Sequence, residues 1–323
     1  MNPSPIRSIL AATDLSPASD EVMRAAGALA SFTGAELHVL HAFDLPPTPY
    51  SDEASLLSPT FERRLDEAER ALDAQIRKTV PDAVEVASRG VQIYVAHRAI
   101  VERAEAVSAD VIVLGPHRRQ STAGEFLGST ADRVVRTASV PCLVVREHLN
   151  LPLHRVVVPF DLSEPSRGAL DVAVGWGAAL AGPLDEGCSA LDLRVVHVLP
   201  ALFVHDLPSG RAVVGPELHR QVEESLARSG RMSDVIVREE LLWGEGASEE
   251  ITGYAERERA DLVVLATHGH GAVKRALLGS VASAVARRVG CSVLLVPPAL
   301  WIAAPAAGEE EQAGARHPAV VVV

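Results

Sequence analysis

The chain alternates short apolar runs with longer segments in which apolar residues recur every three or four positions. The short runs are typical of strands and the periodic segments of helices. Ser16 and Pro17 mark the start of the first helix, with Ser16 as its N-cap, and Gly34 marks its end. In the first half the predicted strands are 9–12, 36–42, 84–88, 111–114 and 142–145, and the predicted helices are 17–32, 61–78, 97–107 and 128–138.

The predicted strands are nearly continuous apolar runs, which is the pattern of a parallel sheet covered on both faces. Right-handed crossovers place helices on both sides of such a sheet, so the pattern predicts a doubly wound α/β fold. Ligands of these folds bind beyond the carboxyl ends of the strands, where the strand order reverses.

The same order of elements occurs twice. "ILAATDLSPAS" recurs as "VVVPFDLSEPS", "ADVIVLGPH" as "ADLVVLATH", and "FLGSTADRVVR" as "LLGSVASAVAR". A repeat of this length predicts two tandem domains, 1–149 and 150–298. Residues 299–323 fall outside the repeat and carry an acidic run, Glu309 to Glu311, so we expect a disordered extension. Two alternatives for this tail are local packing of Trp301 and docking of the apolar "AVVVV" segment on a partner.

Composition narrows the class of protein. A chain of 323 residues with 48% hydrophobic and 22% charged residues is expected to be a soluble globular protein of two domains. The net charge of -12 argues against nucleic-acid and membrane partners. We find no secretory signal and no apolar stretch of the about 18 residues that a membrane span needs. Cys142, Cys188 and Cys291 lack metal-ligand spacing, which favours reduced thiols and a cytoplasmic location.

Two glycine-rich stretches follow the fourth strand of each half: "GPHRRQSTAGEFLGS" and "ATHGHGAVKRALLGS". A glycine lets a phosphate approach the backbone, and a helix start offers N–H groups to it. In the second stretch Gly269 supplies the first feature, and residues 279–281 supply the second. Lys274 and Arg275 add positive charge. The alternative is structural: the glycines form turns and Ser280 caps a helix.

An aspartate follows the first strand of each half, Asp14 in the first and Asp161 in the second. At this position Asp161 faces the crevice that the glycine-rich stretch also faces. Its carboxylate can accept a hydrogen bond from a ribose hydroxyl or an adenine amino group. The alternative is that Asp161 stabilises the start of the helix that follows.

The chain resembles the universal stress protein family in its tandem two-domain form. The second half carries the resemblance in "VPFDLSEPS", "VVHVL", "DLVVLATHGHGAVKRALLGSVASAV" and "CSVLLVP", and the first half in "ILAATDLSPAS", "HVLHAFD", "DVIVLGPHRR" and "VPCLVV". The resemblance implies Rossmann-like domains of the adenine nucleotide alpha hydrolase-like type. It also implies that ATP, with or without Mg²⁺, is held by the signature G-x2-G-x9-G-[S/T].

The resemblance assigns site residues in both halves. Ala266 departs from the first signature glycine and is expected to hinder close approach of a phosphate without abolishing it. Arg118 replaces the second glycine of the first half, where it either blocks the phosphate path or clamps a phosphate. We therefore expect the better site in the second half. The implied cofactor-binding residues are Pro159, Asp161, Val198, Ala266, Thr267, His268, Gly269, Gly271, Gly279, Ser280 and Val281 in the second half, and Asp14, Gly115, Gly128 and Ser129 in the first.

The function implied by the resemblance is regulatory, in a stress response, and the chain is not expected to be an enzyme. No Walker motif and no nucleophile elbow is present in the sequence, we assign no catalytic residue, and Glu245 and Glu249 are expected to be solvated. A slow ATPase, or a nucleotidyl or phosphoryl transferase with Mg²⁺ on Asp14 or Asp161, is one alternative, and a partner-binding scaffold without nucleotide is another. The family's dimer contact further implies that the last strands of the two halves pair as an internal pseudo-dimer, with a homodimer as an additional arrangement.

Overall fold

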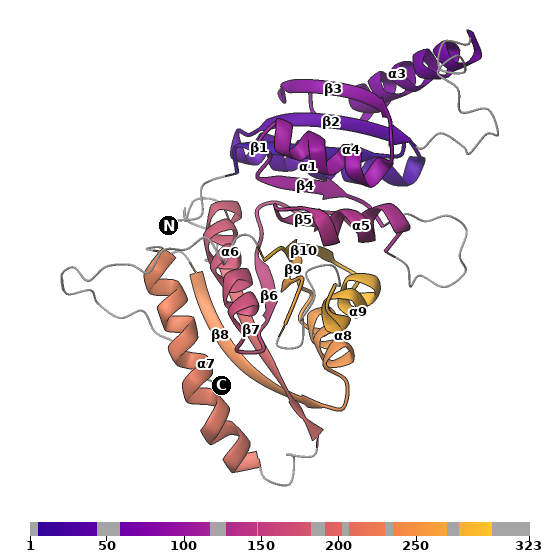
Figure 1. The fold of residues 1–323 in the computed structure, drawn as a ribbon. Coiled ribbons are helices and arrows are strands. Elements are labelled where there is room, and N and C mark those ends of the chain that lie inside the picture. Colours follow the sequence, from indigo (N-terminus) through magenta and orange to yellow (C-terminus); the bar gives the residue numbers. More distant parts are fainter. Residues whose placement is uncertain are drawn as a thin grey trace. The chain divides into compact units, whose positions relative to one another are not determined.

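A computed structural model describes residues 6–43, 59–116, 127–146, 148–181, 191–201, 207–229, 235–269 and 278–298. The chain forms two compact units that divide between Leu149 and Asn150 (Figure 1). The predicted tail 299–323 lies outside the described residues, as do Arg118, Cys188, Gly271, Lys274 and Arg275.

The first unit contains a parallel sheet with the strand order β3-β2-β1-β4-β5. The order reverses beside β1, which confirms the doubly wound fold and puts the switch point between β1 and β4. The elements are β1 (Ser8–Thr13), a 3₁₀ turn (Pro17–Ser19), α1 (Asp20–Thr33), β2 (Glu36–Phe43), α3 (Pro59–Thr79), β3 (Val86–Ile93), α4 (Ala96–Ala106), β4 (Val111–Leu114), α5 (Ser129–Thr137) and β5 (Cys142–Val144).

The second unit repeats this arrangement, with the strand order β8-β7-β6-β9-β10 and all pairs parallel. Helices α6 and α7 pack together on one face of its sheet, and α8 and α9 pack together on the other (Figure 1). The elements are β6 (Arg155–Pro159), α6 (Glu164–Leu180), β7 (Leu191–Pro200), α7 (Leu207–Ser229), β8 (Val235–Gly244), α8 (Ala247–Arg257), β9 (Leu262–Ala266), α9 (Ser280–Arg288) and β10 (Ser292–Val296).

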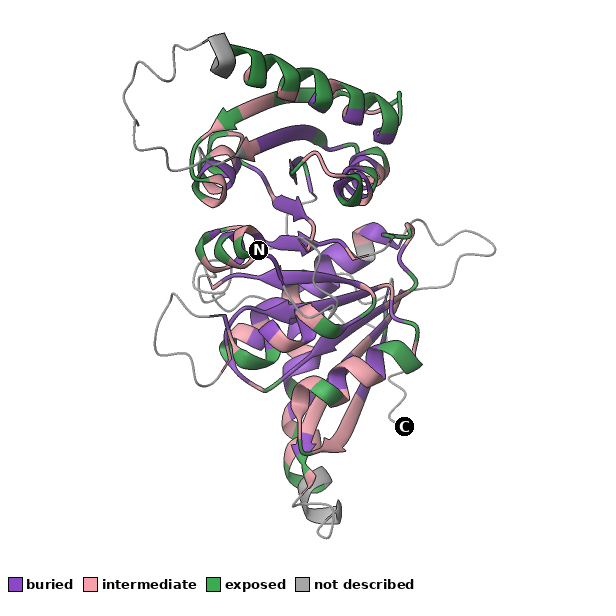
Figure 2. Ribbon diagram, turned by 90° about the vertical axis from the view of Figure 1, so that its right-hand side faces the viewer, coloured by how far each residue is buried: buried purple, intermediate pink, exposed green. Residues whose placement is uncertain are grey.

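The core of each unit lies between the sheet and its helices. Figure 2 shows the central strands as buried, and the fully buried side chains include Ile9, Leu10 and Ile112 in the first unit and Leu191 and Leu193 in the second. A strand covered on both faces must be apolar at successive positions. The central strands therefore have the unbroken apolar runs from which the fold was predicted.

The third strand of each unit departs from that rule. We expected a strand at 84–88, but β3 extends over Val86–Ile93 and alternates between half-buried and exposed positions. β8 likewise mixes buried positions with half-buried and exposed ones. Both strands stand at the end of the strand order among the described residues, so they are covered less completely than the central strands. The sequence rule for buried strands fails at these sheet edges.

The first helix begins later than predicted. Ser16 makes no side-chain capping bond and precedes the 3₁₀ turn Pro17–Ser19, so the α-helix starts at Asp20. Its end is as predicted: Gly34 has φ 71° and its N–H donates to the Ala30 carbonyl at 2.8 Å. A left-handed residue at this point favours glycine because a β-carbon would be strained.

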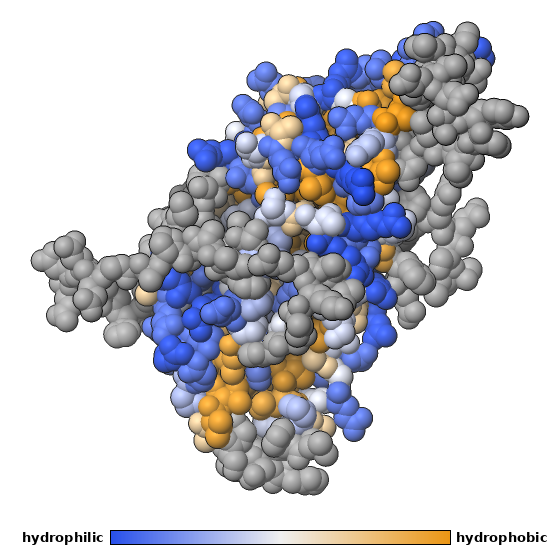
Figure 3. Space-filling view, viewed as in Figure 1, coloured by the Kyte–Doolittle hydropathy of each residue, from blue (hydrophilic) through white to orange (hydrophobic). Residues whose placement is uncertain are grey.

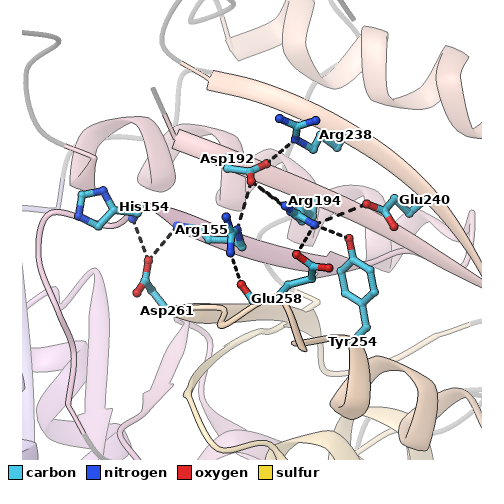
Figure 4. A network of polar contacts seen from close by, with 9 residues as sticks. All are labelled: His154, Arg155, Asp192, Arg194, Arg238, Glu240, Tyr254, Glu258 and Asp261. Atoms are coloured by element: carbon cyan, nitrogen blue, oxygen red, sulfur yellow. Dashed lines mark hydrogen bonds and ion pairs between the residues drawn. The ribbon is translucent and has the colours of Figure 1, made fainter. Parts of the chain in front are cut away.

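A polar network ties the strands of the second unit together near their amino-terminal ends (Figure 4). The Asp192 carboxylate accepts hydrogen bonds from Arg155 at 3.1 Å, Arg194 at 3.0 Å and Arg238 at 3.1 Å. Arg194 also contacts Tyr254 at 3.1 Å, which links the sheet to α8. The network lies toward the strand starts, whereas the predicted nucleotide residues follow the strand ends, so we assign it a structural role.

Candidate functional site

The aspartate at the end of the first strand is held by the turn that follows it. Asp161 Oδ1 accepts hydrogen bonds from the backbone N–H of Ser163, at 3.1 Å, and from the Ser163 hydroxyl. Leu162 between them has φ 66°, in the left-handed region that a leucine rarely adopts. The Ser163 hydroxyl in turn caps α6 by accepting from the N–H of Ser166 at 3.3 Å.

The first unit builds the same turn. Asp14 Oδ1 accepts from the N–H of Ser16 at 2.9 Å, and Leu15 has φ 61°. Both aspartates therefore stabilise the approach to a helix, which is the structural alternative given above for Asp161, and both residues are also exposed at the strand end. The two roles are compatible, because the turn uses one carboxylate oxygen and fixes the direction of the other.

A histidine on the second strand braces the first strand in each unit. His197 Nδ1 donates to the Phe160 carbonyl at 2.7 Å, and His41 Nδ1 donates to the Thr13 carbonyl at 2.8 Å. A carbonyl can only accept, so the proton must sit on Nδ1. Sequence reasoning did not assign this role, although the histidine recurs in "VLH" and "VVH".

Two backbone hydrogen bonds meet at Thr267, the residue that follows β9. We call Thr267, His268 and Gly279 the neck of the glycine-rich stretch. The Thr267 N–H donates to the Val296 carbonyl at 3.0 Å, and the Gly279 N–H donates to the Thr267 carbonyl at 2.7 Å. Thr267 is thus bonded both to the end of β10 and to Gly279, which precedes α9. In the first repeat Pro116 stands at the place of Thr267 and has no N–H to donate.

Gly269 lies against Asp161. A β-carbon at residue 269 would stand 2.7 Å from Asp161 Oδ2, closer than such atoms approach one another. The structure therefore brings together two predicted site residues that are far apart in the sequence. The same observation explains the glycine, since any side chain at residue 269 would push the carboxylate aside.

His268 contributes a buried nitrogen to the neck. Its Nδ1 lies 2.8 Å from the Thr267 hydroxyl oxygen, with which it shares a hydrogen bond. Its Nε2 is buried and has no hydrogen-bond partner within the described part of the chain. Burial lowers the pKa of His268, which favours the neutral ring. A buried polar atom of this kind costs stability unless a ligand or water satisfies it.

The departure at Ala266 has a packing explanation. At the matching position, a β-carbon on Gly115 would stand 2.8 Å from Val22 Cγ2 of α1. A side chain at this position therefore points toward the first helix of the domain. In the second repeat Ala169 occupies the place of Val22, which leaves room for the methyl of the buried Ala266. We therefore expect the methyl of Ala266 to point toward α6, and the hindrance of a phosphate by Ala266 stays a prediction.

The start of α9 offers N–H groups beside the neck. Gly279 is the N-cap, without a side-chain capping bond, so Ser280 is the first helical residue and not the cap. The Gly279 N–H is already used by Thr267, which leaves the exposed Ser280 and Val281 as the donors that follow. In the first unit α5 starts in the same way at Gly128 and Ser129, of which Gly128 is buried.

The charge of the first turn differs between these two helices. α5 carries Asp132 in its first turn, and α9 carries no acidic residue there. Asp132 pairs with Arg136 at 2.7 Å. A carboxylate near a helix start competes with any other anion for the positive end of the helix dipole.

The remaining predicted residues lie at the strand ends. Pro159 ends β6 and is buried, with Val196 as its partner on β7. Val198 follows two positions later on β7 and is half-buried.

Glu249 accepts hydrogen bonds from Ser248 and Arg288 at the start of α8. Within the described ranges, no group of three or more His, Cys, Asp or Glu residues is arranged to hold a metal ion, and no helix has the length and apolar character of a membrane span.

Comparison with protein families matches the universal stress protein family twice, over residues 5–146 and 152–297. The chain belongs to the universal stress protein family. A family member from Mycolicibacterium smegmatis is 27% identical over 307 residues, which cover 90% of this chain and 97% of that protein. The universal stress protein MJ0531 of Methanocaldococcus jannaschii is 33% identical over 158 residues, which cover 47% of this chain and 86% of that protein.

Solved structures share the fold over both units. A universal stress protein from Archaeoglobus fulgidus superposes with a TM-score of 0.56 at 19% identity, covering 90% of this chain and 96% of that one. A functionally unknown protein from Pseudomonas aeruginosa superposes with a TM-score of 0.59 at 18% identity, covering 92% and 95%. At this identity the likeness concerns the family fold alone.

Proposed function

We propose that the chain is a cytoplasmic, adenine-nucleotide-binding regulatory protein of the stress response, and that its second domain holds ATP more tightly than its first. The observation that carries this proposal is the proximity of Gly269 to Asp161. This proximity brings two features together. One is the strand end, where a carboxylate can reach a ribose or an adenine, and the other is the glycine-rich stretch, whose backbone a phosphate can approach. Membership of the family supports the same ligand.

The residues of the second domain fit a nucleotide in three ways. Gly269 carries no side chain that would fill the space beside Asp161. His268 offers a buried nitrogen that needs a partner. Ser280 and Val281 present N–H groups at a helix start, where anions bind well. We assign Pro159, Asp161 and Val198 to the base and ribose, and His268, Gly269, Ser280 and Val281 to the phosphates.

Electrostatics favour the second domain over the first. The Asp132 carboxylate in the first turn of α5 repels an anion there, and the first turn of α9 has no acidic residue. A charge at a helix end is worth about 0.3–1 kcal/mol, which corresponds to a difference in affinity of up to about fivefold. Arg118 at the second signature glycine of the first repeat adds to this expected difference if its side chain blocks the phosphate path, and reduces it if it clamps a phosphate.

We propose binding without turnover. Hydrolysis or group transfer would need a residue that positions water or accepts a proton beside the terminal phosphate. We assign that role to no residue of the chain, so ATP acts in the proposal as a signal or a stabilising ligand. Mg²⁺ would accompany the phosphates as it does on ATP in solution.

The experiment that tests this function measures nucleotide content and affinity together. Purified protein is denatured and the released small molecules are identified by mass. Calorimetric titration with ATP then compares the native chain with Gly279→Val, which disrupts the neck bond to Thr267, and with Gly128→Val as the matched change in the first repeat. We expect Gly279→Val to remove most of the binding and Gly128→Val to remove less.

Three results would contradict the proposal in different ways. The absence of ATP binding to the native chain would leave the partner-binding scaffold as the function. A greater loss in Gly128→Val would reverse the preference between the domains. Sustained release of phosphate from Mg-ATP by native protein, lost in Gly279→Val, would make the chain an ATPase.

A further inference from the structure

Two neighbouring side chains of the neck, Thr267 and His268, are paired in the interior. Among the described residues, hydrophilic side chains make up much of the face that Figure 3 shows, where water satisfies their hydrogen bonds. Thr267 and His268 are instead only 2% and 9% exposed. The Thr267 hydroxyl oxygen lies 2.8 Å from His268 Nδ1, and within the described ranges neither side chain has a second hydrogen-bond partner.

The number of unpaired groups decides which side chain donates this hydrogen bond. A hydroxyl has one hydrogen, and a neutral imidazole carries its proton on one of its two nitrogens. If Nδ1 donated to Thr267, the hydroxyl hydrogen and the lone pair of Nε2 would both be buried without a partner. If the hydroxyl donates, only the Nε2–H of His268 remains unpaired. The second arrangement is favoured, because each unpaired buried polar group lowers stability.

The histidine lies between the two parts of the proposed nucleotide site. A β-carbon on Gly279, the N-cap of α9, would stand 3.8 Å from His268 Cα. The residue after His268 is Gly269, which lies against Asp161. Burial lowers the pKa of His268, so the ring is neutral at neutral pH. A neutral ring with an unpaired N–H suits an ionised phosphate oxygen, because such an oxygen can accept a hydrogen bond but has none to donate.

The first repeat keeps the histidine and lacks the hydroxyl. In the sequence His117 matches His268, and Pro116 matches Thr267. A proline offers neither a hydroxyl nor an N–H, so it has no group with which to hold the ring of the histidine that follows. The pair of Thr267 with His268 is therefore a feature of the second repeat, for which we propose the tighter binding of ATP.

We propose that Thr267 is a positioning residue, which holds His268 with its ring proton on Nε2 so that this N–H donates to a phosphate of the bound nucleotide. This inference rests on the proposed function, because it takes ATP as the ligand. Thr267 acts through His268 and makes no contact with the nucleotide itself. A ring held in the donating tautomer before the ligand arrives loses less freedom on binding, which favours affinity.

NMR of the histidine rings tests the tautomer without any ligand. Nitrogen–proton correlation spectra of protein with isotope-labelled histidines distinguish a protonated ring nitrogen from an unprotonated one. The signals of His268 are those that disappear in His268→Leu. We expect the proton on Nε2 in the native chain and in Thr267→Ser, which keeps the hydroxyl, and a mixture of both tautomers in Thr267→Val. A proton on Nδ1 in the native chain would overturn the proposal.

Calorimetric titration with ATP, inorganic tripolyphosphate and adenosine tests the contact with phosphate. Thr267→Val removes the hydroxyl and keeps the backbone groups that bond to Val296 and Gly279. It should weaken the binding of ATP and tripolyphosphate about threefold to tenfold, as for one lost hydrogen bond, and leave adenosine unchanged. Thr267→Ser should bind all three like the native chain.

Thr252→Val is the matched control for this titration. The Thr252 hydroxyl of α8 is also buried, and it has no hydrogen-bond partner in the part of the chain that the structure describes. Its removal should therefore leave the tautomer of His268 and all three affinities unchanged. In a His268→Leu background, Thr267→Val should have no further effect on ATP affinity, because the threonine acts through the histidine.

Two results of the titrations would overturn this inference alone. One is ATP binding by the native chain with the same affinity in Thr267→Val, and the other is an equal loss of affinity for ATP and adenosine. A further loss in the His268→Leu background would make Thr267 a direct contact, which also contradicts the proposal. The absence of ATP binding to the native chain would instead contradict the proposed function, and with it the role of Nε2–H toward phosphate.

Discussion

Gly269 and Asp161 are so close that a β-carbon on the glycine would stand 2.7 Å from the carboxylate oxygen Oδ2. The carboxylate cannot swing away freely, because its other oxygen is held by Ser163. The glycine at this signature position is therefore required by a neighbouring side chain in the protein itself. This contact couples the strand end to the glycine-rich stretch before any ligand binds.

A double-mutant cycle measures this coupling. Gly269→Ala should lower the free energy of unfolding by about 1 kcal/mol, at the low end of the cost of overpacking. In an Asp161→Ala background the same change should cost nearly nothing, since the clashing oxygen is gone. Gly215→Ala, at a helix position with open space around it, is the control and should be neutral or slightly stabilising. Additive effects of the two changes would show that the residues do not touch.

His268→Leu separates a ligand-binding role from a structural one. The leucine removes the buried Nε2, which has no partner among the described residues, but also the hydrogen bond between Nδ1 and the Thr267 hydroxyl, so the two effects offset and the melting temperature of the unliganded protein should change little. ATP affinity should fall about tenfold, as for the loss of a hydrogen bond to a charged group. His117→Leu changes the matching residue of the first repeat and should leave the tighter site intact. A large loss of stability with unchanged affinity would make His268 purely structural.

Exchange of one first-turn residue between α5 and α9 tests whether helix charge contributes to the preference of ATP for the second domain. Ser283 of α9 stands where α5 has Asp132, and Arg287 stands where α5 has Arg136. Ser283→Asp can therefore form the same ion pair and fold, while it places a negative charge at the start of α9. ATP affinity of the second domain should fall by up to about fivefold, more at low salt than at high salt. Asp132→Ser should raise the ATP affinity of the first domain. Unchanged affinity in both variants would exclude the helix start as a phosphate contact.

Asp192→Asn should destabilise the second unit strongly. Burial alone would raise the pKa of Asp192, but hydrogen bonds from Arg194 and Arg155 outweigh it and lower the pKa below its ordinary value of 3.8. The stabilisation is thus present above about pH 4 and is lost as the pH falls through the lowered pKa. At neutral pH the variant should lose about 1.5–3 kcal/mol, as when half-buried hydrogen bonds between charged groups are weakened.

Tryptophan emission during urea unfolding measures this loss, because every tryptophan lies in the second half of the chain. The matched control is Glu36→Gln, since Glu36 occupies the same strand position in the first repeat with an exposed side chain. Its effect should stay within about 0.5 kcal/mol. The native chain and Asp192→Asn should converge in stability at low pH. A constant difference down to pH 2 would mean that the ionised carboxylate is not the source of the stabilisation.

The sequence was most informative where one local rule decides the structure. The strands β1 and β4 were predicted because burial on both faces requires an unbroken apolar run. The end of the first helix was predicted because a helix end favours glycine, here Gly34. The edges β3 and β8 were predicted less well, since their pattern depends on which strand has no neighbour. The proximity of Gly269 to Asp161 could be expected only from topology and resemblance. The bond from Gly279 to Thr267, the bracing by His197 and the cluster around Asp192 could not, because each depends on side-chain directions in three dimensions.

The first repeat combines Gly115 with Val22, whereas the second combines Ala266 with Ala169. This difference affects how the two repeats of the gene can recombine. The two repeats encode similar segments, and recombination between them would join the first helix of one repeat to the fourth strand of the other. One hybrid would set Val22 against the methyl of Ala266, where the first repeat has no space for a β-carbon. The other would leave Gly115 facing Ala169 across a void. Both hybrids would therefore be less stable than either repeat. Selection against them lets each half accumulate its own changes while the duplication persists.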